Sequence, residues 1–488
     1  MLPQILKNIN VLKSSSLFVN SFWGILSNIL QNIFLTLFFV ILARQLGTDD
    51  FAQYLISNAL YLLLAAFSTL GLSQWFIREL DTTTDERGLI TRFFKIQFYF
   101  GLAFYVLNAL TAWILYSEPD IRIFSLIFGF NIIFDNIIYA IKALNIAKLQ
   151  QKITFKILII EAVLLFALAC SLYLHDFSAI FIIAAQVVIR FFTLNLFIRM
   201  GTSRLVSARS IARYKVAFQD IQALVLKNWV FVIIGSISLV YWRSANIIVS
   251  KFLPLADVAI YAITYKVFSV FIILPLIVSS TVYPALVRKF NQNDPASLKH
   301  YYQNVYGLYF LYGLLSFSFI YSFSDILLPF IFSETYQSTA FYTKEMFLTM
   351  LVFPTAILQA NLLVAIKQER MDMWINLACL AVYAVLTAIG FYIHESLTVI
   401  YLSIFISFLI FHIIQDVVLI RKNILTPGHM ASFYLLSIGG TLAYVGLVEY
   451  INQYLFFIVF WLVVGSGFLL YYMRKRNKRP LPQGAEHS

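Results

Sequence analysis

The sequence predicts an all-α polytopic membrane protein with about 14 transmembrane helices. The first observation is composition, because the 488 residues are 61% hydrophobic and 12% charged, with a mean hydropathy of +0.83. A soluble protein of this length could not bury so much apolar surface. The second observation is that continuous apolar runs of about 20 residues, the length of a membrane-crossing helix, recur from end to end. The third is that basic residues concentrate in alternate loops.

Each expected span is an apolar run bounded by polar or charged residues. In chain order, the spans cover residues 17–42, 53–76, 96–116, 121–142, 157–174, 177–198, 228–250, 258–283, 304–323, 341–366, 373–393, 396–420, 431–450 and 454–473. Pro275 and Pro354 interrupt two of them. Broken helices are common where a transporter gates, and a static kink is the equally open alternative. Cys170 and Cys379 lie in separate runs, which indicates packing residues rather than a disulfide.

The loops between these spans alternate in charge. Of the 35 Lys and Arg residues, 28 lie in the set of loops that includes both termini. The opposite set holds Arg44, Arg122, Lys251 and Lys344, and the spans hold Arg190, Arg243 and Lys266. Basic loops stay in the cytoplasm, so we expect both termini to be cytoplasmic and the number of spans to be even.

An internal repeat divides the chain. Shifted by 207 residues, Arg44–Tyr54 matches Lys251–Tyr261 in its cation, Leu, Asp, Ala and Tyr positions. Both copies follow the first span of a half, so the halves share one orientation and form a parallel repeat about the membrane normal. The expected domains are an N-terminal lobe of six spans (1–200), a basic cytoplasmic linker (201–227), a C-terminal lobe of six spans (228–420), and two last helices with a basic tail (421–488).

Two cations flank the turn of the second repeat. Arg243 precedes Pro254 by 11 residues and Lys266 follows it by 12, so both lie at nearly the same depth on neighbouring helices. A charge at that depth costs about 2.5–3.5 kcal/mol and normally faces a cavity or a partner. No acid is close in sequence, so the pair predicts a site for an anionic ligand. The alternative is that these side chains reach back to the interface.

The motifs around the two turns resemble a known family. Ile41–Phe51, the Leu-Gly-Leu of residues 70–72 and Arg78-Glu79 resemble the opening of Wzx-type polysaccharide or O-antigen flippases. These belong to the oligosaccharide flippase family of the multidrug/oligosaccharidyl-lipid/polysaccharide exporter superfamily. Tyr261, Lys266, Pro275 and Tyr283-Pro284 fit the same family in the second half. Ala52 departs from it, because the family usually has Gly there.

The resemblance implies a transporter rather than an enzyme. Its expected cargo is an undecaprenyl-diphosphate-linked oligosaccharide, a lipopolysaccharide or other surface-polysaccharide precursor, moved by alternating access from the cytoplasmic to the periplasmic leaflet of the bacterial inner membrane. Membrane lipids are the expected surroundings, and a polysaccharide polymerase and a chain-length regulator are candidate protein partners. The resemblance implies neither a cofactor nor nucleic acid, and it leaves proton or sodium coupling open.

A diphosphate cargo gives the intramembrane charges candidate roles. Arg243, Lys266 and Arg190 are candidate substrate-binding residues, because Arg and Lys in a wet cavity offset the desolvation of an anion. Arg190 could instead pair with Asp135 or Glu161, the two acids inside the first lobe. Those acids are candidates for ion coupling, or partners for a nearby lysine such as Lys142.

The remaining polar groups are less specific. Arg78, at the cytoplasmic end of the second span, could receive the headgroup, or could be an interfacial anchor paired with Glu79. His412 and Asp416 stand four residues apart with no third ligand in view, so the sequence predicts no metal site.

Two rival functions differ in what they require. A multidrug-type cation antiporter of the same superfamily needs acids in its cavity, and this chain has more deep cations than acids. A membrane-embedded polysaccharide polymerase or ligase needs a sizeable external loop, whereas every expected outward loop is short.

Overall fold

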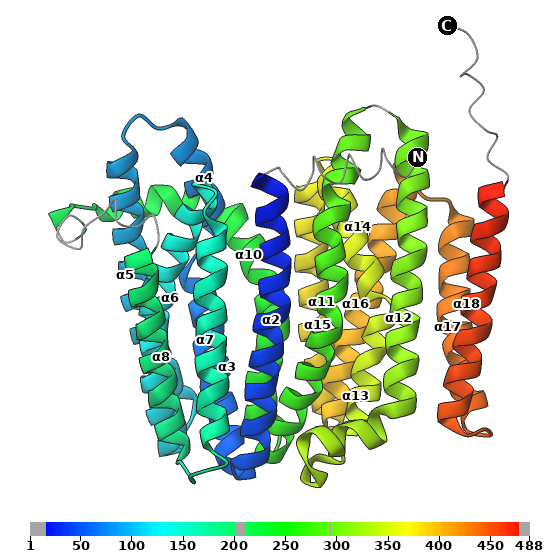
Figure 1. The fold of residues 1–488 in the computed structure, drawn as a ribbon, viewed down its shortest axis with the longest axis horizontal. Coiled ribbons are helices and arrows are strands. Elements are labelled where there is room, and N and C mark those ends of the chain that lie inside the picture. The colour runs from blue at the N-terminus through cyan, green and yellow to red at the C-terminus, as the bar shows by residue number, and fades with distance from the viewer. Residues whose placement is uncertain (1–15, 201–210, 212, 293, 478–488) are drawn as a thin grey trace, which may run out of the picture. The chain divides into compact units, whose positions relative to one another are not determined.

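The computed structural model describes residues 16–200, 211, 213–292 and 294–477, and its secondary structure there is helical, without strands. Figure 1 follows the helices from α2 in blue to α18 in red. Within these ranges, 11 helices are long and apolar enough to cross a membrane, and two shorter apolar helices cover Ile29–Gln45 and Gln453–Gly467. The all-α, multi-pass prediction is therefore confirmed, whereas the number 14 stays a prediction.

Twelve of the fourteen predicted spans each fall on one helix of the structure, and the second and the tenth each cover more than one element. The helices are α2 (Ser16–Gln45), α3 (Thr48–Ser68), α4 (Ser73–Thr82), α5 (Glu86–Leu115), α6 (Pro119–Ala147), α7 (Gln151–Ser171), α8 (Ala179–Met200), α10 (Phe218–Phe252), α11 (Leu255–Asn291), α12 (Pro295–Phe332), α13 (Thr339–Phe347), α14 (Phe353–Ala365), α15 (Glu369–Ile393), α16 (Leu397–Arg421), α17 (Pro427–Val448) and α18 (Gln453–Asn477). Short 3₁₀ turns cover Glu334–Tyr336 (η2) and Leu348–Leu351 (η3). Most of the basic linker expected at 201–227 lies outside the described residues or continues into α10.

Two predicted spans are broken in the structure. The second ends at Ser68, because Leu70 and Gly71 adopt positive φ angles of 49° and 59°, a conformation that glycine tolerates and a right-handed helix excludes. The tenth divides into α13, η3 and α14. Pro354 lies in the first turn of α14, where its missing N–H costs no hydrogen bond.

Pro275, by contrast, does not end its helix, so a break of that span is wrong, whereas the alternative of a static kink stays a prediction. It lies inside the continuous α11. A proline removes the hydrogen bond to the carbonyl four residues earlier, which here is Phe271. The Tyr312 hydroxyl of α12 donates to that carbonyl at 2.6 Å, and the Tyr309 hydroxyl donates to the carbonyl of Pro275 itself at 3.1 Å. These bonds from a neighbouring helix satisfy the backbone without a break.

The chain forms two compact units that interleave along the sequence. The first comprises Met1–Val270, Ile331–Thr339 and Met373–Ser403, and the second comprises Phe271–Phe330, Ala340–Asp372 and Ile404–Ser488. The division into two six-span lobes with a linker at 201–227 stays a prediction.

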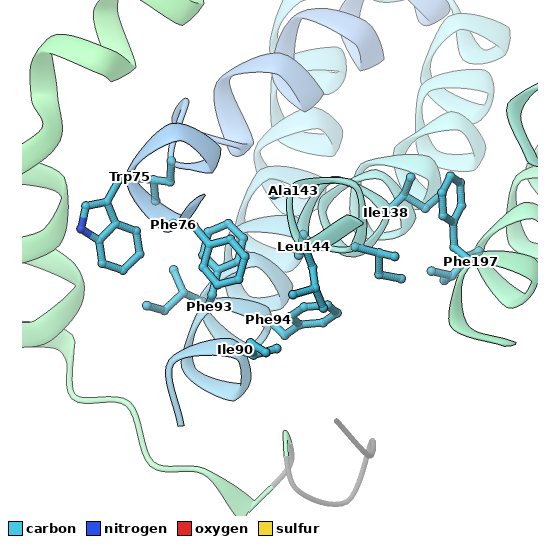
Figure 2. Packing of buried hydrophobic residues seen from close by; sticks show 14 of the residues in the cluster. Trp75, Phe76, Ile90, Phe93, Phe94, Ile138, Ala143, Leu144 and Phe197 are labelled. Carbon is cyan, nitrogen blue, oxygen red and sulfur yellow. The ribbon is translucent and has the colours of Figure 1, made fainter. Parts of the chain in front are cut away.

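The first unit packs around α6. This helix contacts α3, α5 and α8, while α7 packs against α2 and α8. Figure 2 shows a buried apolar cluster in which Phe76 stacks on Phe93, and their ring centroids are 4.2 Å apart. Ile138 of α6 and Phe197 of α8 belong to the same cluster and lie on its other side in this view. Lipid is as apolar as these side chains, so close packing rather than exclusion from water holds the cluster together. The cluster fixes the two helices that carry Asp135 and Arg190.

The second unit packs around α12. Besides its bonds to α11, this helix accepts a bond of 2.9 Å at Ser318 Oγ from the Trp461 indole of α18, and Ser322 lies 2.6 Å from the Tyr444 hydroxyl of α17. Gly313 allows α12 to approach η3 closely, because a Cβ there would lie 2.3 Å from the Met350 carbonyl oxygen. Polar pairs and a small residue therefore hold these helices together, as expected in a membrane.

Candidate functional site

A cavity of about 520 Å³ opens within the first unit, between α2, α3, α6, α7, α8, α10 and α11. This volume is typical of a site for a small molecule or part of a larger one. Its wall mixes amides and aromatic rings with charged groups. The uncharged polar and aromatic side chains are Gln31, Asn32, Asn58, Asn131, Gln186, Asn246, Ser269, Phe38, Phe39, Tyr54, Tyr61, Phe128 and Tyr265.

Three cations from three helices line this cavity: Arg190 of α8, Arg243 of α10 and Lys266 of α11. The same three cations are the ones that the sequence places inside spans. The structure thus brings together in one cavity three residues that belong to different helices. The Arg243 guanidinium lies 6.0 Å from the Tyr265 ring centroid, and Lys266 Nζ lies 5.9 Å from that of Phe39. Both are at the outer limit of a cation–π contact.

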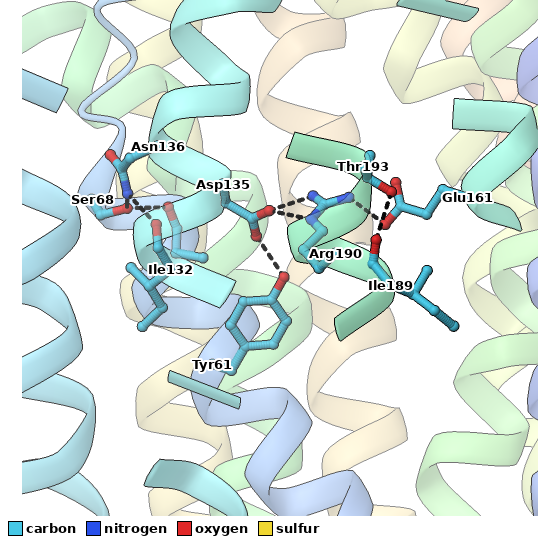
Figure 3. A network of polar contacts seen from close by, with 10 residues as sticks. Tyr61, Ser68, Ile132, Asp135, Asn136, Glu161, Ile189, Arg190 and Thr193 are labelled. Carbon is cyan, nitrogen blue, oxygen red and sulfur yellow. Dashed lines mark hydrogen bonds and ion pairs between the residues drawn. The ribbon is translucent and has the colours of Figure 1, made fainter. Parts of the chain in front are cut away.

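Arg190 is the paired member of the three (Figure 3). Its Nε donates to Asp135 Oδ1 at 2.6 Å, its Nη2 forms an ion pair with the same oxygen, and its Nη1 reaches Glu161 Oε1 at 2.5 Å. The Tyr61 hydroxyl donates to Asp135 Oδ2 at 2.5 Å. The side chains of Asp135 and Glu161 are only 15% and 9% exposed. Arg190 is therefore paired with acids inside the first unit, which is the alternative to substrate binding that the sequence left open.

The other two cations are different. Among the residues that the structure describes, no carboxylate forms a salt bridge with Arg243 or Lys266. Arg190, Asp135 and Glu161 together carry a formal charge of −1, and Lys142 on α6 lies close enough to interact with all three electrostatically. The positive charge on the α10–α11 wall of the cavity is therefore not neutralised by protein groups of the described chain.

Arg78 stands apart from this site. It is exposed on α4 and does not line the cavity. Its suggested role in receiving the headgroup therefore stays a prediction, because Arg78 is not part of the cavity wall. Within the described ranges, no group of three His, Cys, Asp or Glu side chains could hold a metal ion.

Sequence reasoning missed the uncharged part of the site. Gln186, which lines the cavity and lies 3.2 Å from the Tyr54 hydroxyl, precedes Arg190 by four residues on the same helix face. That spacing could have indicated it. Tyr61, Asn58 and Asn246 carry no comparable signal, because polar residues in apolar helices face a cavity or a neighbouring helix equally well.

Comparisons with known proteins show the family and the fold of the chain. A family model described as "Polysaccharide biosynthesis protein" matches residues 41–341. No curated protein sequence matches the chain. Among solved structures, the fold is similar to the lipid II flippase MurJ in an inward closed conformation, with a TM-score of 0.70 and 13% identity, covering 93% of this chain and 99% of that one.

Two transporters of the MOP superfamily are similar as well. An inward-facing multidrug resistance MATE family transporter has a TM-score of 0.66 and 11% identity, covering 81% of this chain and 94% of that one. A transporter from Pyrococcus furiosus, described as having a binding pocket of reverse polarity, has a TM-score of 0.57 and 10% identity, with coverage of 85% and 97%. At these identities the likeness shows the fold, whereas the family model spans most of the chain, and the chain therefore belongs to the polysaccharide biosynthesis protein family.

Proposed function

We propose that this protein is a flippase that moves undecaprenyl-diphosphate-linked oligosaccharide units across the bacterial inner membrane, as a Wzx-type flippase does. The observation that carries the proposal is the pair Arg243 and Lys266, two cations on one wall of a membrane-embedded cavity with no acid bound to them in the described chain. An apolar residue at either position would be cheaper by a few kcal/mol unless an anion visits the cavity.

A diphosphate fits these two cations. It carries its charge through a region of low dielectric, where hydrogen bonds between ions are shorter and stronger than between neutral groups. Arg243 can offer two parallel N–H donors to phosphate oxygens, and Lys266 adds a compact charge with three donors. Binding in the cavity would replace part of the hydration that the diphosphate loses when it leaves the leaflet.

The uncharged wall fits a glycan. Sugar hydroxyls both donate and accept, so they suit amide side chains, and sugar rings can stack on aromatic faces. Asn131 Oδ1 and Gln186 Nε2 are buried in the cavity wall, and neither has a hydrogen-bond partner among the protein groups described. An acceptor and a donor are thus available to a polar ligand.

The similar structures are consistent with this cargo but do not identify it. One is a lipid II flippase, and another is described as having a pocket whose reversed polarity suggests a different function within a transporter superfamily. A cation antiporter, the main alternative, would need free acids. Here Asp135 and Glu161 are both bound to Arg190. We also propose that both termini are cytoplasmic, that the chain performs no catalysis, and that Arg78 makes only an early, interfacial contact with the headgroup.

Glycan export relative to membrane abundance tests the proposal. We expect Arg243→Ala and Lys266→Ala to reduce export strongly while the protein still inserts. Arg243→Glu should be the most damaging change because it repels the diphosphate, and Arg243→Lys should be milder because only the bidentate geometry is lost. Arg122→Ala is the matched control, because Arg122 contacts Trp113 outside the cavity.

Normal export by both Lys266→Ala and Arg243→Glu would contradict the proposed site. Proteoliposomes loaded with a defined lipid-linked oligosaccharide separate the two classes of transporter. The flippase should move this lipid and leave a cationic dye in place, whereas transport of the dye alone would favour the antiporter.

We propose in addition that Asp135 and Glu161 couple transport to a proton or sodium gradient. Their bonds to Arg190 would then exchange for bonds to the ion during the cycle. Asp135→Asn and Glu161→Gln should each retain exchange of labelled for unlabelled cargo but lose acceleration by an imposed gradient. If both variants keep full gradient-driven transport, the coupling site lies elsewhere.

A further inference from the structure

A second buried cluster of polar side chains lies in the second unit, independent of the cavity. His412 and Asp416 of α16 face each other across one helical turn, with 3.2 Å between His412 Nδ1 and Asp416 Oδ2, and their side chains are 0% and 1% exposed. The helix around them is apolar enough to span a membrane. His412 precedes the helix end at Arg421 by nine residues, or about 14 Å along the axis.

The hydrogen bonds around Asp416 are those of an ionised carboxylate. Gln359 Nε2 of α14 donates to Oδ1 at 2.5 Å, and the Tyr434 hydroxyl of α17 donates to Oδ2 at 3.0 Å. No Lys or Arg of the described chain forms a salt bridge with it. An unbalanced carboxylate is unfavourable in such a place, so His412 is the group that can neutralise it.

The contacts around His412 fit a ring that donates from both nitrogens. Nδ1 lies 2.6 Å from the Tyr434 oxygen, whose proton is directed to Asp416. Nε2 lies 3.0 Å from Thr355 Oγ1, whose own proton is donated to the Val352 carbonyl. Both nitrogens therefore face oxygens that can accept, which is the pattern of an imidazolium.

The same cluster can also hold the neutral ring. Tyr306 lies 3.2 Å from Nε2, and its hydroxyl can either accept from the imidazolium or turn its proton towards a bare nitrogen. The ring itself is held between the hydroxyls by a stack on Phe433 at 4.6 Å. One proton can thus leave Nε2 without leaving that atom unsatisfied.

The other titratable groups near the pair are few. α12 presents Tyr302 and Tyr306, α15 presents Asp372 through Gln415, and α17 presents Tyr434 and His429, which in turn interacts with Lys299. None of them supplies a cation bonded to Asp416. The formal charge of the His412–Asp416 pair is therefore zero with the proton and −1 without it.

From this geometry we infer that His412 and Asp416 form a binding site for one exchangeable proton, where four membrane helices of the second unit meet. The packed cluster holds the proton, and its release leaves a net negative charge that favours entry of water between α12, α14, α16 and α17. A sodium ion fits less well, because the carboxylate oxygens already face N–H and O–H donors, which a cation would have to displace. The inference does not rest on the proposed cargo.

Nitrogen NMR of the histidine rings tests this site directly. The full-length chain, labelled with ¹⁵N-histidine and placed in lipid nanodiscs, contains six histidines, and His412→Gln identifies the signal of His412. We expect the wild type to show the imidazolium pattern at neutral pH and to lose it reversibly in alkali. In Asp416→Asn, the neutral pattern should replace it at the same neutral pH.

Asp325→Asn is the matched control, because this exposed carboxylate of the same unit pairs with Lys344 and should leave the His412 signal unchanged. Tyr434→Phe is the second variant, which tests the site if Asp416→Asn fails to fold, because it keeps both His412 and Asp416. We expect it to weaken the imidazolium pattern by removing the bridging hydroxyl.

Three results would overturn the inference. These are a neutral His412 throughout the pH range, an imidazolium signal that neither Asp416→Asn nor Tyr434→Phe affects, and a signal that changes at constant pH when sodium replaces choline. The last result would assign the site to sodium instead. Hydrogen–deuterium exchange of α16 provides the second readout. Relative to the intrinsic exchange rate at each pH, protection of α16 should fall in alkali in the wild type and stay constant in His412→Gln.

Discussion

Replacing Arg190 should destabilise the protein far more than replacing Arg243, although both cations line the same cavity. Arg190→Met removes the partner of Asp135 and Glu161, whose side chains are 15% and 9% exposed. Removing one member of a buried ion pair costs about 3–5 kcal/mol, because the remaining charge stays desolvated. Two carboxylates lose their partner here, so we expect the upper part of that range.

Arg243→Met should change stability by no more than about 1 kcal/mol. It gives up a contact at the limit of cation–π range, worth about 0.5–1 kcal/mol, and it relieves the desolvation of a charge. No acid of the described chain is left behind. The two substitutions should therefore have different effects. Arg190→Met should mainly affect folding, and Arg243→Met should mainly affect transport.

Thermal unfolding in detergent, followed with a thiol-reactive dye, measures the difference, because Cys379 is buried and reacts when the helices separate. The triple variant Asp135→Asn, Glu161→Gln, Arg190→Met is the control, and it should recover most of the loss, because neutral groups need no counter-charge. Equal midpoints for the two single variants would refute the reasoning, and so would a triple variant as unstable as Arg190→Met.

Two further predictions concern packing and topology. Gly313→Ala should lower the free energy of unfolding by about 1–3 kcal/mol, because its Cβ would overlap the Met350 carbonyl. Gly307→Ala on the same helix is the control, because its Cβ would meet nothing within 4 Å, and it should be neutral or slightly stabilising. The unfolding midpoints of the two variants measure the difference, and equal losses would contradict the steric argument. A cysteine at His394 should react with an impermeant reagent in intact cells and one at Asn423 should not, and labelling of Asn423 from outside would reverse the proposed topology.

The class of the fold could be predicted from the sequence because the relevant signals are local. A run of about 20 apolar residues spans a bilayer whatever its neighbours are, and α6 and α8 lie where such runs predict them. The repeat inferred from the matching turns around Arg44 and Lys251 stays a prediction. The continuation of the helix past Pro275 could not be predicted, because the Phe271 carbonyl that the proline leaves without a partner accepts from the Tyr312 hydroxyl of another helix, α12.

The membership of the site was partly within reach of the sequence. Any ionised side chain in an apolar run is costly, so the amino-acid sequence alone singles out Arg190, Arg243 and Lys266 as candidates. Which of them is neutralised depends on helix packing. Asp135 and Glu161 lie 55 and 29 residues from Arg190, and only the contacts of α6, α7 and α8 place them on its guanidinium.

The same distinction applies to His412. Its spacing to Asp416 is fixed by the helix repeat and is visible in the sequence. Its other partners, Thr355 and Tyr306, are 57 and 106 residues away, and they decide which protons the ring can hold. The sequence by itself determined where charge enters the membrane, because burial of an apolar run is a local property. Only the tertiary structure decided how that charge is balanced, because hydrogen bonds and ion pairs require atoms of different helices to meet within about 3 Å.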